Sequence, residues 1–250
     1  MIDYNPYSLK GKTILITGAS SGIGRATAIE CSRMGAIVYI TGRNEERLHE
    51  TLLSLEGEGH KYIVCDLNDE MSIDKLVDNL PEIQGLVNNA GITKILPLQF
   101  INVDFLNQIV NVNTIAPILL FQKLIKRKKI KKGASIVFTS SMAGLGTCAA
   151  GTSMYAASKG AISSFIRSAA LELAPKNIRV NAVCPGMIMT DILNEVPIPR
   201  EQLEDNLKQY PLGRYGSPKD VALAMIFLLS EASSWMTGDN LVIDGGLTLK

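Results

Sequence analysis

Tyr155 and Lys159 stand four residues apart in Ser-Met-Tyr-Ala-Ala-Ser-Lys-Gly, so one turn of helix would place a phenol beside an ammonium group. A free tyrosine titrates near pH ~10, and a nearby cation that stabilises the phenolate would let it exchange a proton at neutral pH. The spacing therefore predicts a general acid/base pair. A solvated helix face can show the same spacing, so this interpretation needs support from other parts of the chain.

Three short segments upstream give that support: Thr-Gly-Ala-Ser-Ser-Gly-Ile-Gly at 17–24, Asn-Asn-Ala-Gly at 88–91, and Ser-Ser-Met-Ala-Gly at 140–144. The glycine-rich segment follows an apolar strand pattern and leads into a helical one. In that context Gly18 permits a tight turn, Gly22 lets the backbone approach a pyrophosphate, and Gly24 lets the helix pack closely. The free amides at the start of the helix would then face phosphates, which predicts a dinucleotide site.

The end of the second predicted strand indicates which nucleotide binds. A carboxylate there would bind the ribose 2′-hydroxyl of NAD and repel the 2′-phosphate of NADP. Residues 39–44, Tyr-Ile-Thr-Gly-Arg-Asn, contain no carboxylate but do contain Arg43, whose guanidinium can bind a phosphate through two parallel hydrogen bonds. We expect NADP(H) to be preferred over NAD(H). The alternative is that Arg43 is only a surface residue at the start of the next helix.

Taken in chain order, these segments resemble the classical short-chain dehydrogenase/reductase family: the glycine turn, Asn-Asn-Ala-Gly, Asn113, Ser141, Tyr155 with Lys159, and Pro185-Gly186. The resemblance runs from about Gly11 to Gly246. Within the family the chain is most similar to 3-oxoacyl-(acyl carrier protein) reductases of fatty acid metabolism. Asp244-Gly245-Gly246 near the end contributes to this narrower similarity.

The resemblance implies a role for each of four catalytic residues. Tyr155 would donate the proton in reduction, and Lys159 would lower the tyrosine pKa and hold the nicotinamide ribose. Ser141 would polarise the substrate carbonyl, and Asn113 would hold a water that links Lys159 to solvent. Such a set is needed because hydride transfer to a ketone builds alkoxide charge, which a positioned donor must neutralise.

The serine assignment has an alternative, because Ser141 lies 14 residues before Tyr155, one more than the interval associated with close relatives. Ser140 lies 15 residues before the tyrosine. The extra residue is most simply placed in the loop 145–153, which contains Gly146 and Gly151. We assign Ser141, because Ser-Met-Ala-Gly at 141–144 matches the family pattern Ser-x-Ala-Gly, and keep Ser140 as the alternative.

The resemblance also implies contacts with the cofactor. Asp66, after the third strand, would bind the adenine amino group, although it could instead cap the next helix, as could Asp69. The backbone of Ile188 would bind the nicotinamide carboxamide, and Thr190 would lie near the phosphates. The complete expected set is Gly18, Ser20, Ser21, Gly22, Ile23, Gly24, Arg43, Asp66, Leu67, Asn89, Ala90, Gly91, Tyr155, Lys159, Pro185, Gly186, Ile188 and Thr190.

Short, uniformly apolar segments alternate with helical patterns along the chain. Strands are predicted at 13–17, 37–40, 62–65, 86–87, 135–139, 180–184 and 241–243, and helices at 22–34, 44–55, 69–79, 100–128, 154–173, 200–209 and 218–230. Strands without polar alternation are typical of a parallel sheet covered by helices on both faces. We therefore expect an α/β fold with one doubly wound, Rossmann-type sheet of about seven strands. Pro117 should kink or interrupt the fourth helix.

Composition narrows the function further. The chain has 250 residues, 46% of them hydrophobic, which fits one domain over 1–250 with its core at about 11–246 and a mobile lid at about 187–210. A net charge of +1 gives no reason to expect nucleic acid or a membrane as partner. The four cysteines show no spacing typical of a disulfide or a metal site, and no metal is expected. The start of the chain lacks a secretory signal pattern, so we expect a cytoplasmic protein. His49 and His60 receive no role.

Two further interpretations stay open beside an NADPH-dependent 3-oxoacyl thioester reductase. The chain could act on a free sugar, polyol or steroid alcohol, or it could be a non-catalytic NADP-binding sensor, which the four catalytic residues argue against. The basic run at 126–132, with Lys176, could attract an acidic acyl carrier protein near the mouth of the site; it could also be a solvated helix end. A homo-oligomer, tetramer or dimer, is expected through the helices at 100–128 and 154–173.

Overall fold

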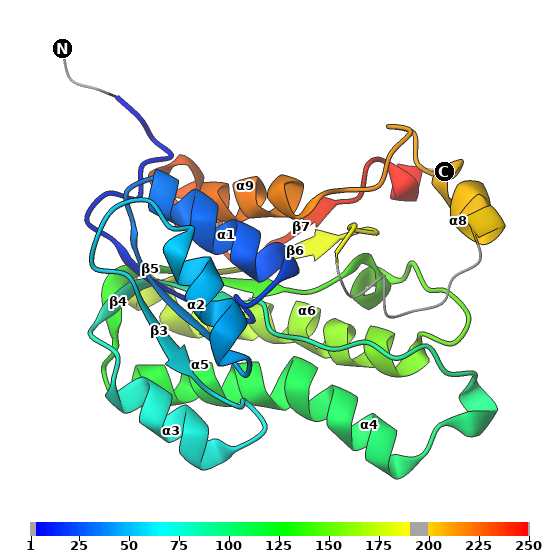
Figure 1. Ribbon diagram of the computed structural model, residues 1–250, viewed down its shortest axis with the longest axis horizontal. Coiled ribbons are helices and arrows are strands. Elements are labelled where there is room, and N and C mark those ends of the chain that lie inside the picture. Colours follow the sequence, from blue (N-terminus) through cyan, green and yellow to red (C-terminus); the bar gives the residue numbers. More distant parts are fainter. Residues whose placement is uncertain (1–3, 191–199, 250) are drawn as a thin grey trace.

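The computed structural model describes residues 4–190 and 200–249, which form one parallel sheet with the strand order β3-β2-β1-β4-β5-β6-β7 (Figure 1). The strands are β1 Thr13–Thr17, β2 Ile37–Gly42, β3 Lys61–Val64, β4 Ile83–Asn88, β5 Ile130–Thr139, β6 Arg179–Pro185 and β7 Asn240–Ile243. The predicted seven-stranded Rossmann-type sheet is confirmed, although β4 and β5 are longer than predicted. Residues 191–199 of the predicted lid lie outside the described residues.

Helices cover both faces of the sheet, as Figure 1 shows. One face packs against α1 Gly22–Arg33, α2 Glu45–Leu53 and α9 Pro218–Leu229, and the other against α3 Glu70–Asp78, α5 Ala116–Lys126 and α6 Ser153–Leu173. Successive strand residues point to opposite faces. Ile14 and Ile16 therefore pack in the core under α1, α2 and α9, and Leu15 packs in the core under α3, α5 and α6. Both faces being buried is the physical reason that these strands lack polar alternation.

The order in which strands are added to the sheet reverses between β1 and β4. From β1 the chain adds β2 and β3 on one side, and then returns to place β4 against β1 on the other. The crevice at such a switch point, outside the carboxyl ends of the strands, is where ligands bind in open α/β sheets. Thr17 and Asn88 end the two central strands and therefore mark this edge.

The fourth predicted helix is divided into three parts, as expected from Pro117. It consists of α4 Val103–Val110, a π-helical turn at Asn111–Ile115, and α5, in which Pro117 is the second residue. By length and composition, Val103–Lys126 could cross a membrane. Its apolar residues have another explanation, because Leu120 and Leu124 are fully buried against the sheet.

The basic run at 126–132 does not lie where we predicted. Helix α5 ends at Lys126, and Lys131 and Lys132 belong to the amino end of β5 rather than to a helix. Arg127 is occupied by ion pairs with Asp74 and Asp78 on α3. Ile130 and Phe138 of β5 pair with Ile83 and Asn88 of β4, so the carboxyl end of β5 is roughly 20 Å from Ile130 at the rise of a strand. The interpretation that this run lies near the site mouth of its own subunit is therefore wrong, and the alternative of a solvated helix end fits the exposed Lys126 at the end of α5.

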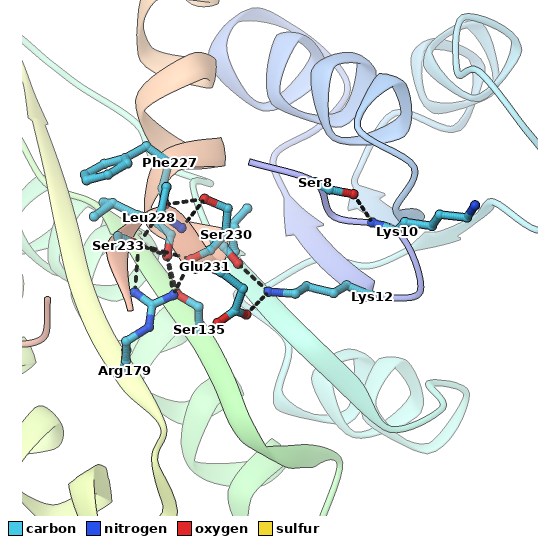
Figure 2. A network of polar contacts seen from close by, with 12 residues as sticks. Ser8, Lys10, Lys12, Ser135, Arg179, Phe227, Leu228, Ser230, Glu231 and Ser233 are labelled. Carbon is cyan, nitrogen blue, oxygen red and sulfur yellow. Dashed lines mark hydrogen bonds and ion pairs between the residues drawn. The ribbon is translucent and has the colours of Figure 1, made fainter. Parts of the chain in front are cut away.

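Two cations organise the amino edge of the sheet by holding the end of α9 (Figure 2). Arg179 donates to the main-chain oxygens of Leu228 at 2.9 Å and Ser230 at 3.0 Å. Lys12 donates to the oxygen of Leu229 at 3.1 Å and to Glu231 at 2.9 Å. These carbonyls end a helix and have no intrahelical donors, so the side chains satisfy them and favour the negative end of the helix dipole.

Candidate active site

The glycine turn between β1 and α1 packs backbone against backbone. Gly18 has φ +66°, and a Cβ added to it would lie 2.8 Å from the Cα of Ala90. A Cβ on Gly24 would lie 2.2 Å from the oxygen of Gly18. Because real Cβ atoms do not approach so closely, these positions require glycine, and α1 lies as close to the turn as predicted for Gly24.

The start of α1 is open toward the crevice. Its N-cap residue, Ser21, makes no side-chain capping hydrogen bond, and the first turn contains no acidic residue. The first amides of the helix are thus available to an anion. Thr190 lies beside them, since its Cγ2 atom is 3.3 Å from the Cβ position of Gly22. Ser20 lies on the other side, with its Oγ atom 3.5 Å from the Cβ position of Gly42.

Arg43 directly follows β2, next to Ser20. It is exposed, and no acidic side chain in the described part of the chain forms an ion pair with it. Asn44, the next residue, caps α2 by accepting a hydrogen bond from the amide of Arg47 at 2.9 Å. The cap of α2 therefore does not involve Arg43, and its guanidinium is available to a phosphate.

At the end of β3, the two acidic residues have different roles. Asp69 is the N-cap of α3 and accepts from the amide of Met71 at 3.0 Å. Asp66 is exposed, and its carboxylate accepts from the amide of Asn68 at 2.9 Å. Since Asp69 provides the cap, the alternative role for Asp66 is not needed, and Asp66 remains a candidate for adenine. Leu67 packs against the core.

Tyr155 lies in the first turn of α6, and Lys159 lies one turn later. The Lys159 Nζ atom is 5.9 Å from the centre of the Tyr155 ring and donates a 2.7 Å hydrogen bond to the main-chain oxygen of Thr139. Burial lowers the pKa of Lys159 to about 8. Burial raises the pKa of Tyr155, although a hydrogen bond with Ser141 acts in the opposite direction. The predicted lowering of the tyrosine pKa is therefore not seen in the protein alone.

The two serines after β5 occupy different environments. Ser140 is 1% exposed; its hydroxyl donates to the main-chain oxygen of Lys159 at 2.9 Å and lies 2.7 Å from the Ser163 hydroxyl. Ser141 is half-buried; its hydroxyl accepts from the amide of Ala143 at 3.2 Å and lies close enough to Tyr155 to lower the pKa of that phenol. The side chain facing the tyrosine is thus Ser141, while Ser140 ties β5 to α6. The interval of 14 residues is absorbed by a short 3-10 helix, Met142–Leu145, and the following loop.

Asn113 lies in the π-helical turn and is nearly fully buried. Its side-chain oxygen accepts from the amide of Ile92 at 2.8 Å, and its side-chain nitrogen donates to the Ile92 oxygen and to the Ser158 hydroxyl, at 2.9 and 3.0 Å. The side chain therefore positions the loop after β4. Pro117, four residues later, has no N–H, so the α-helical bond to the main-chain oxygen of Asn113 cannot form. That oxygen is the atom that Asn113 can offer to a water.

The segment after β6 is fixed by a short bridge. The Met189 amide donates to the Gly216 oxygen at 2.9 Å, and the Gly216 amide donates to the Met187 oxygen at 3.0 Å. Because backbone groups alternate along an extended segment, the N–H and C=O of Ile188 itself point away from Gly216. This arrangement leaves them free for a ligand. Pro185 ends β6, and the amide of Gly186 donates to the oxygen of Ile243.

Comparison with known proteins agrees with this geometry. A family model described as enoyl-(acyl carrier protein) reductase matches residues 18–248. The chain is 38% identical to a 3-oxoacyl-(acyl carrier protein) reductase of Rickettsia bellii over 96% of its own length and 98% of that protein. It is 37% identical to the Thermotoga maritima protein of the same name, over 96% and 99% of the two lengths. The chain belongs to the short-chain dehydrogenase/reductase family.

Solved structures in this family have the same fold. A protein described as an NAD(P)-dependent gluconate 5-dehydrogenase, from Beutenbergia cavernae with bound NADP, is 30% identical, with a TM-score of 0.89 over 98% of this chain and all of that one. A protein described as a 2-deoxy-D-gluconate 3-dehydrogenase, from Agrobacterium tumefaciens with bound NADP, is 28% identical, with a TM-score of 0.88 over 99% and 100%. As a short-chain dehydrogenase/reductase, the chain is an NAD(P)-dependent oxidoreductase of alcohol and carbonyl groups.

The short-chain dehydrogenase/reductase site also depends on residues that we did not predict. The Thr17 hydroxyl accepts from the amides of Asn89 and Ala90, both at 3.0 Å, and the Thr139 hydroxyl donates to the Asn89 side chain at 3.2 Å. These contacts tie the ends of β1, β4 and β5 together. The sequence feature that could have indicated them is that Thr17 and Thr139 are each the last residue of an apolar strand segment. Ser158, which fixes Asn113, gave no comparable signal.

Proposed function

We propose that the protein is an NADPH-dependent reductase of 3-oxoacyl thioesters, which it converts to the 3-hydroxyacyl form. The observation that carries this proposal is the apolar character of the loops around Tyr155. Segments 89–102, 140–152 and 186–190 follow β4, β5 and β6, and they contain one charged residue, Lys94. Exposed apolar side chains stand on all three: Ile95, Leu98, Leu145 and Met189.

An apolar rim suits an acyl chain better than a polyol. A site that is specific for sugars carries polar side chains that hydrogen-bond the sugar hydroxyls. A substrate without those hydroxyls is rejected because it leaves the polar side chains unpaired. The loops after β4 and β5 lie side by side, because the amide of Leu96 donates to the oxygen of Gly151 at 2.8 Å and the Ile95 side chain lies against Gly151. The named activity of the curated relatives supports the same conclusion.

Each catalytic side chain then has a defined task. Tyr155 donates its proton to the developing alkoxide, and the nearby Ser141 hydroxyl also donates toward the carbonyl oxygen. Lys159 uses one of its three N–H donors on Thr139, which leaves two for the ribose hydroxyls. Its positive charge favours the phenolate as the proton leaves. The main-chain oxygen of Asn113 holds the water that returns a proton through Lys159. The bound nicotinamide supplies the hydride.

We base a preference for NADPH on Arg43 and Ser20: Ser20 lies beside Gly42, the last residue of β2, and Arg43 directly follows it. A 2′-phosphate placed there meets a guanidinium with no ion-pair partner in the described structure and a hydroxyl that can donate. Replacing Arg43 with Asp should reverse the preference in kcat/KM between NADPH and NADH. Unchanged preference in Arg43→Asp would show that another residue selects the cofactor.

The direct test of the proposed function is NADPH oxidation with acetoacetyl thioesters, compared with simple ketones, steroid ketones and keto-sugars. We expect the thioesters to give the highest kcat/KM. Tyr155→Phe should lower kcat by at least about 10³-fold while NADPH binding, followed by fluorescence, is retained. A higher kcat/KM with a keto-sugar would instead support the sugar dehydrogenase activity by which two structural neighbours are described.

We also propose a homo-oligomeric assembly and an acyl carrier protein as the substrate's carrier, in the cytoplasm. Exposed apolar residues on α4, the π-helical turn and α6, namely Val103, Leu106, Ile115 and Leu171, support pairing through these helices. Light scattering of the purified protein measures the oligomeric state. A monomer at micromolar concentration would contradict this assembly.

A further inference from the structure

Lys94 is the one charged residue in segments 89–102, 140–152 and 186–190, and its surroundings are unusual for a lysine. It is half-buried, and its Nζ atom lies 3.1 Å from the centre of the Phe105 ring. No carboxylate forms an ion pair with it anywhere in residues 4–190 or 200–249. An ammonium on an aromatic face is held in place while its three N–H donors remain without a strong acceptor.

The ring beneath Lys94 is itself fixed. Phe105 belongs to the first turn of α4, and its amide donates to the side chain of the N-cap residue Asn102 at 2.9 Å. The lysine backbone is fixed from both sides along the chain, because Ile92 is bound by Asn113 and Leu96 is bound by Gly151. The charge of Lys94 is therefore presented at a defined place.

That place is the outer part of the apolar rim. Gly91 lies at the catalytic end of the loop, because its Cβ position is 3.3 Å from the Lys159 Nζ atom. Lys94 follows it by three residues, so the two Cα atoms are at most about 11 Å apart. A pantetheine arm has the length of roughly four extended residues, about 14 Å, between its thioester and its phosphate. With a thioester held near Tyr155, a phosphate at the end of the arm reaches the neighbourhood of Lys94.

We propose that Lys94 is a specificity-determining residue that binds the phosphate of a phosphopantetheine arm. This inference rests on the proposed function, since it requires an acyl thioester as substrate. A lysine ammonium binds a phosphate as a point charge. The apolar rim accommodates the uncharged acyl and pantetheine portions, and Lys94 is the group in these loops that recognises the anionic end. Carrier proteins and coenzyme A both present this phosphate.

The experiment compares acetoacetyl esters of N-acetylcysteamine, pantetheine and 4′-phosphopantetheine, of which only the last carries the phosphate. The unmodified protein should have a KM about tenfold lower for the phosphorylated substrate than for acetoacetyl-pantetheine, and added salt should reduce the difference. Lys94→Gln should remove this advantage while kcat and the KM for the two uncharged substrates stay unchanged. Lys94→Arg should retain most of it. Lys131→Gln, at the opposite edge of the sheet, is the matched control and should change nothing.

Two results would overturn the proposal for Lys94 alone: turnover of all three thioesters with no phosphate advantage, or a loss in Lys94→Gln that is equal for all three. The second result would assign Lys94 and Phe105 a purely structural contact. Absence of turnover with every thioester would instead overturn the proposed function, and this proposal with it. If the phosphate advantage is found, the KM for acetoacetyl-coenzyme A is compared with the KM for acetoacetyl carrier protein. The substrate with the lower KM identifies which carrier presents the phosphate to Lys94.

Discussion

The Lys159 Nζ atom donates a 2.7 Å hydrogen bond to the main-chain oxygen of Thr139, a neutral acceptor, and no acidic side chain in the described structure pairs with it. Burying an ammonium with such a partner costs hydration that the hydrogen bond does not fully replace. This is the physical reason that the pKa of Lys159 falls to about 8. The same relationship aims the remaining N–H donors into the crevice.

The first prediction concerns the pH dependence of ketone reduction. Lys159 carries its charge below its pKa of about 8 and loses it as the pH rises through that value. Because the charge is needed to stabilise the phenolate of Tyr155, kcat/KM for reduction should be highest below about pH 8 and fall above it. Initial rates between about pH 6 and pH 10 with saturating NADPH measure this profile. A flat profile up to pH 10 would contradict the assigned role.

The second prediction concerns stability in the absence of cofactor. The pKa of Lys159 is lower in the folded state than its ordinary value of 10.5, so the unfolded state binds more protons between about pH 8 and 10.5. Below pH 8 the full cost of burying the charge is present, about 3 kcal/mol, and it is relieved as the pH rises. Lys159→Met should therefore be more stable than the parent at pH 7 by about 1–3 kcal/mol, although inactive.

Urea unfolding at several pH values tests this stability prediction. The difference between Lys159→Met and the parent should shrink from pH 7 toward pH 10, because the parent loses the buried charge. Lys131→Met removes an exposed ammonium on β5 and should show no such trend. If Lys159→Met were less stable than the parent at pH 7, the hydrogen bond to Thr139 would outweigh the cost of burial.

The third prediction separates the two adjacent serines. Ser141→Ala removes the hydroxyl near Tyr155 that would donate to the substrate oxygen, so kcat should fall by about 10²–10³-fold with little change in stability. Ser140→Ala removes a buried hydroxyl that donates to the main-chain oxygen of Lys159, so it should cost about 1–3 kcal/mol of stability. Comparing kcat with the urea midpoint for both variants assigns the roles. A larger loss of kcat in Ser140→Ala than in Ser141→Ala would reverse the assignment.

Features encoded locally in the chain were predictable from the sequence. The strands were recognised because a sheet buried on both faces needs uninterrupted apolar segments, and the division of the helix near Pro117 because proline lacks an N–H. Gly24 was recognised because only glycine permits the contact with the oxygen of Gly18, at 2.2 Å from its Cβ position. These constraints act between residues close in sequence or through a known motif.

Features that depend on distant contacts were not predictable. The direction of the Tyr155 pKa shift depends on how deeply the folded chain buries the phenol, which the spacing to Lys159 does not specify. The basic run was misplaced because a helix and a long strand carry it to the far edge of the sheet. Thr17 and Thr139 become important only when β1, β4 and β5 lie side by side.

The last prediction tests the amino edge of the sheet, away from the chemistry. Arg179 is partly buried, and four of its hydrogen bonds go to α9 and the turn after it: to Leu228, Ser230, Ser233 and Met236. Arg179→Met would keep much of the apolar stem but remove four hydrogen bonds of a charged donor, and leave the Leu228 and Ser230 oxygens only the hydroxyls of Ser135 and Ser233. We expect a loss of about 2–4 kcal/mol in the free energy of unfolding, with kcat and KM near the parent values.

The matched control for Arg179 is Arg33 on α1, which pairs with the exposed Glu56 and with the buried Glu30. Exposed ion pairs contribute little, and Glu30 keeps Lys219 at 3.6 Å as a partner, so Arg33→Met should cost about 1 kcal/mol. Urea unfolding of both variants, with NADPH oxidation measured in parallel, makes the comparison. Equal and small losses would show that water satisfies the end of α9 without Arg179. A large loss of kcat in Arg179→Met would show that the amino edge is coupled to the site at the opposite ends of the strands.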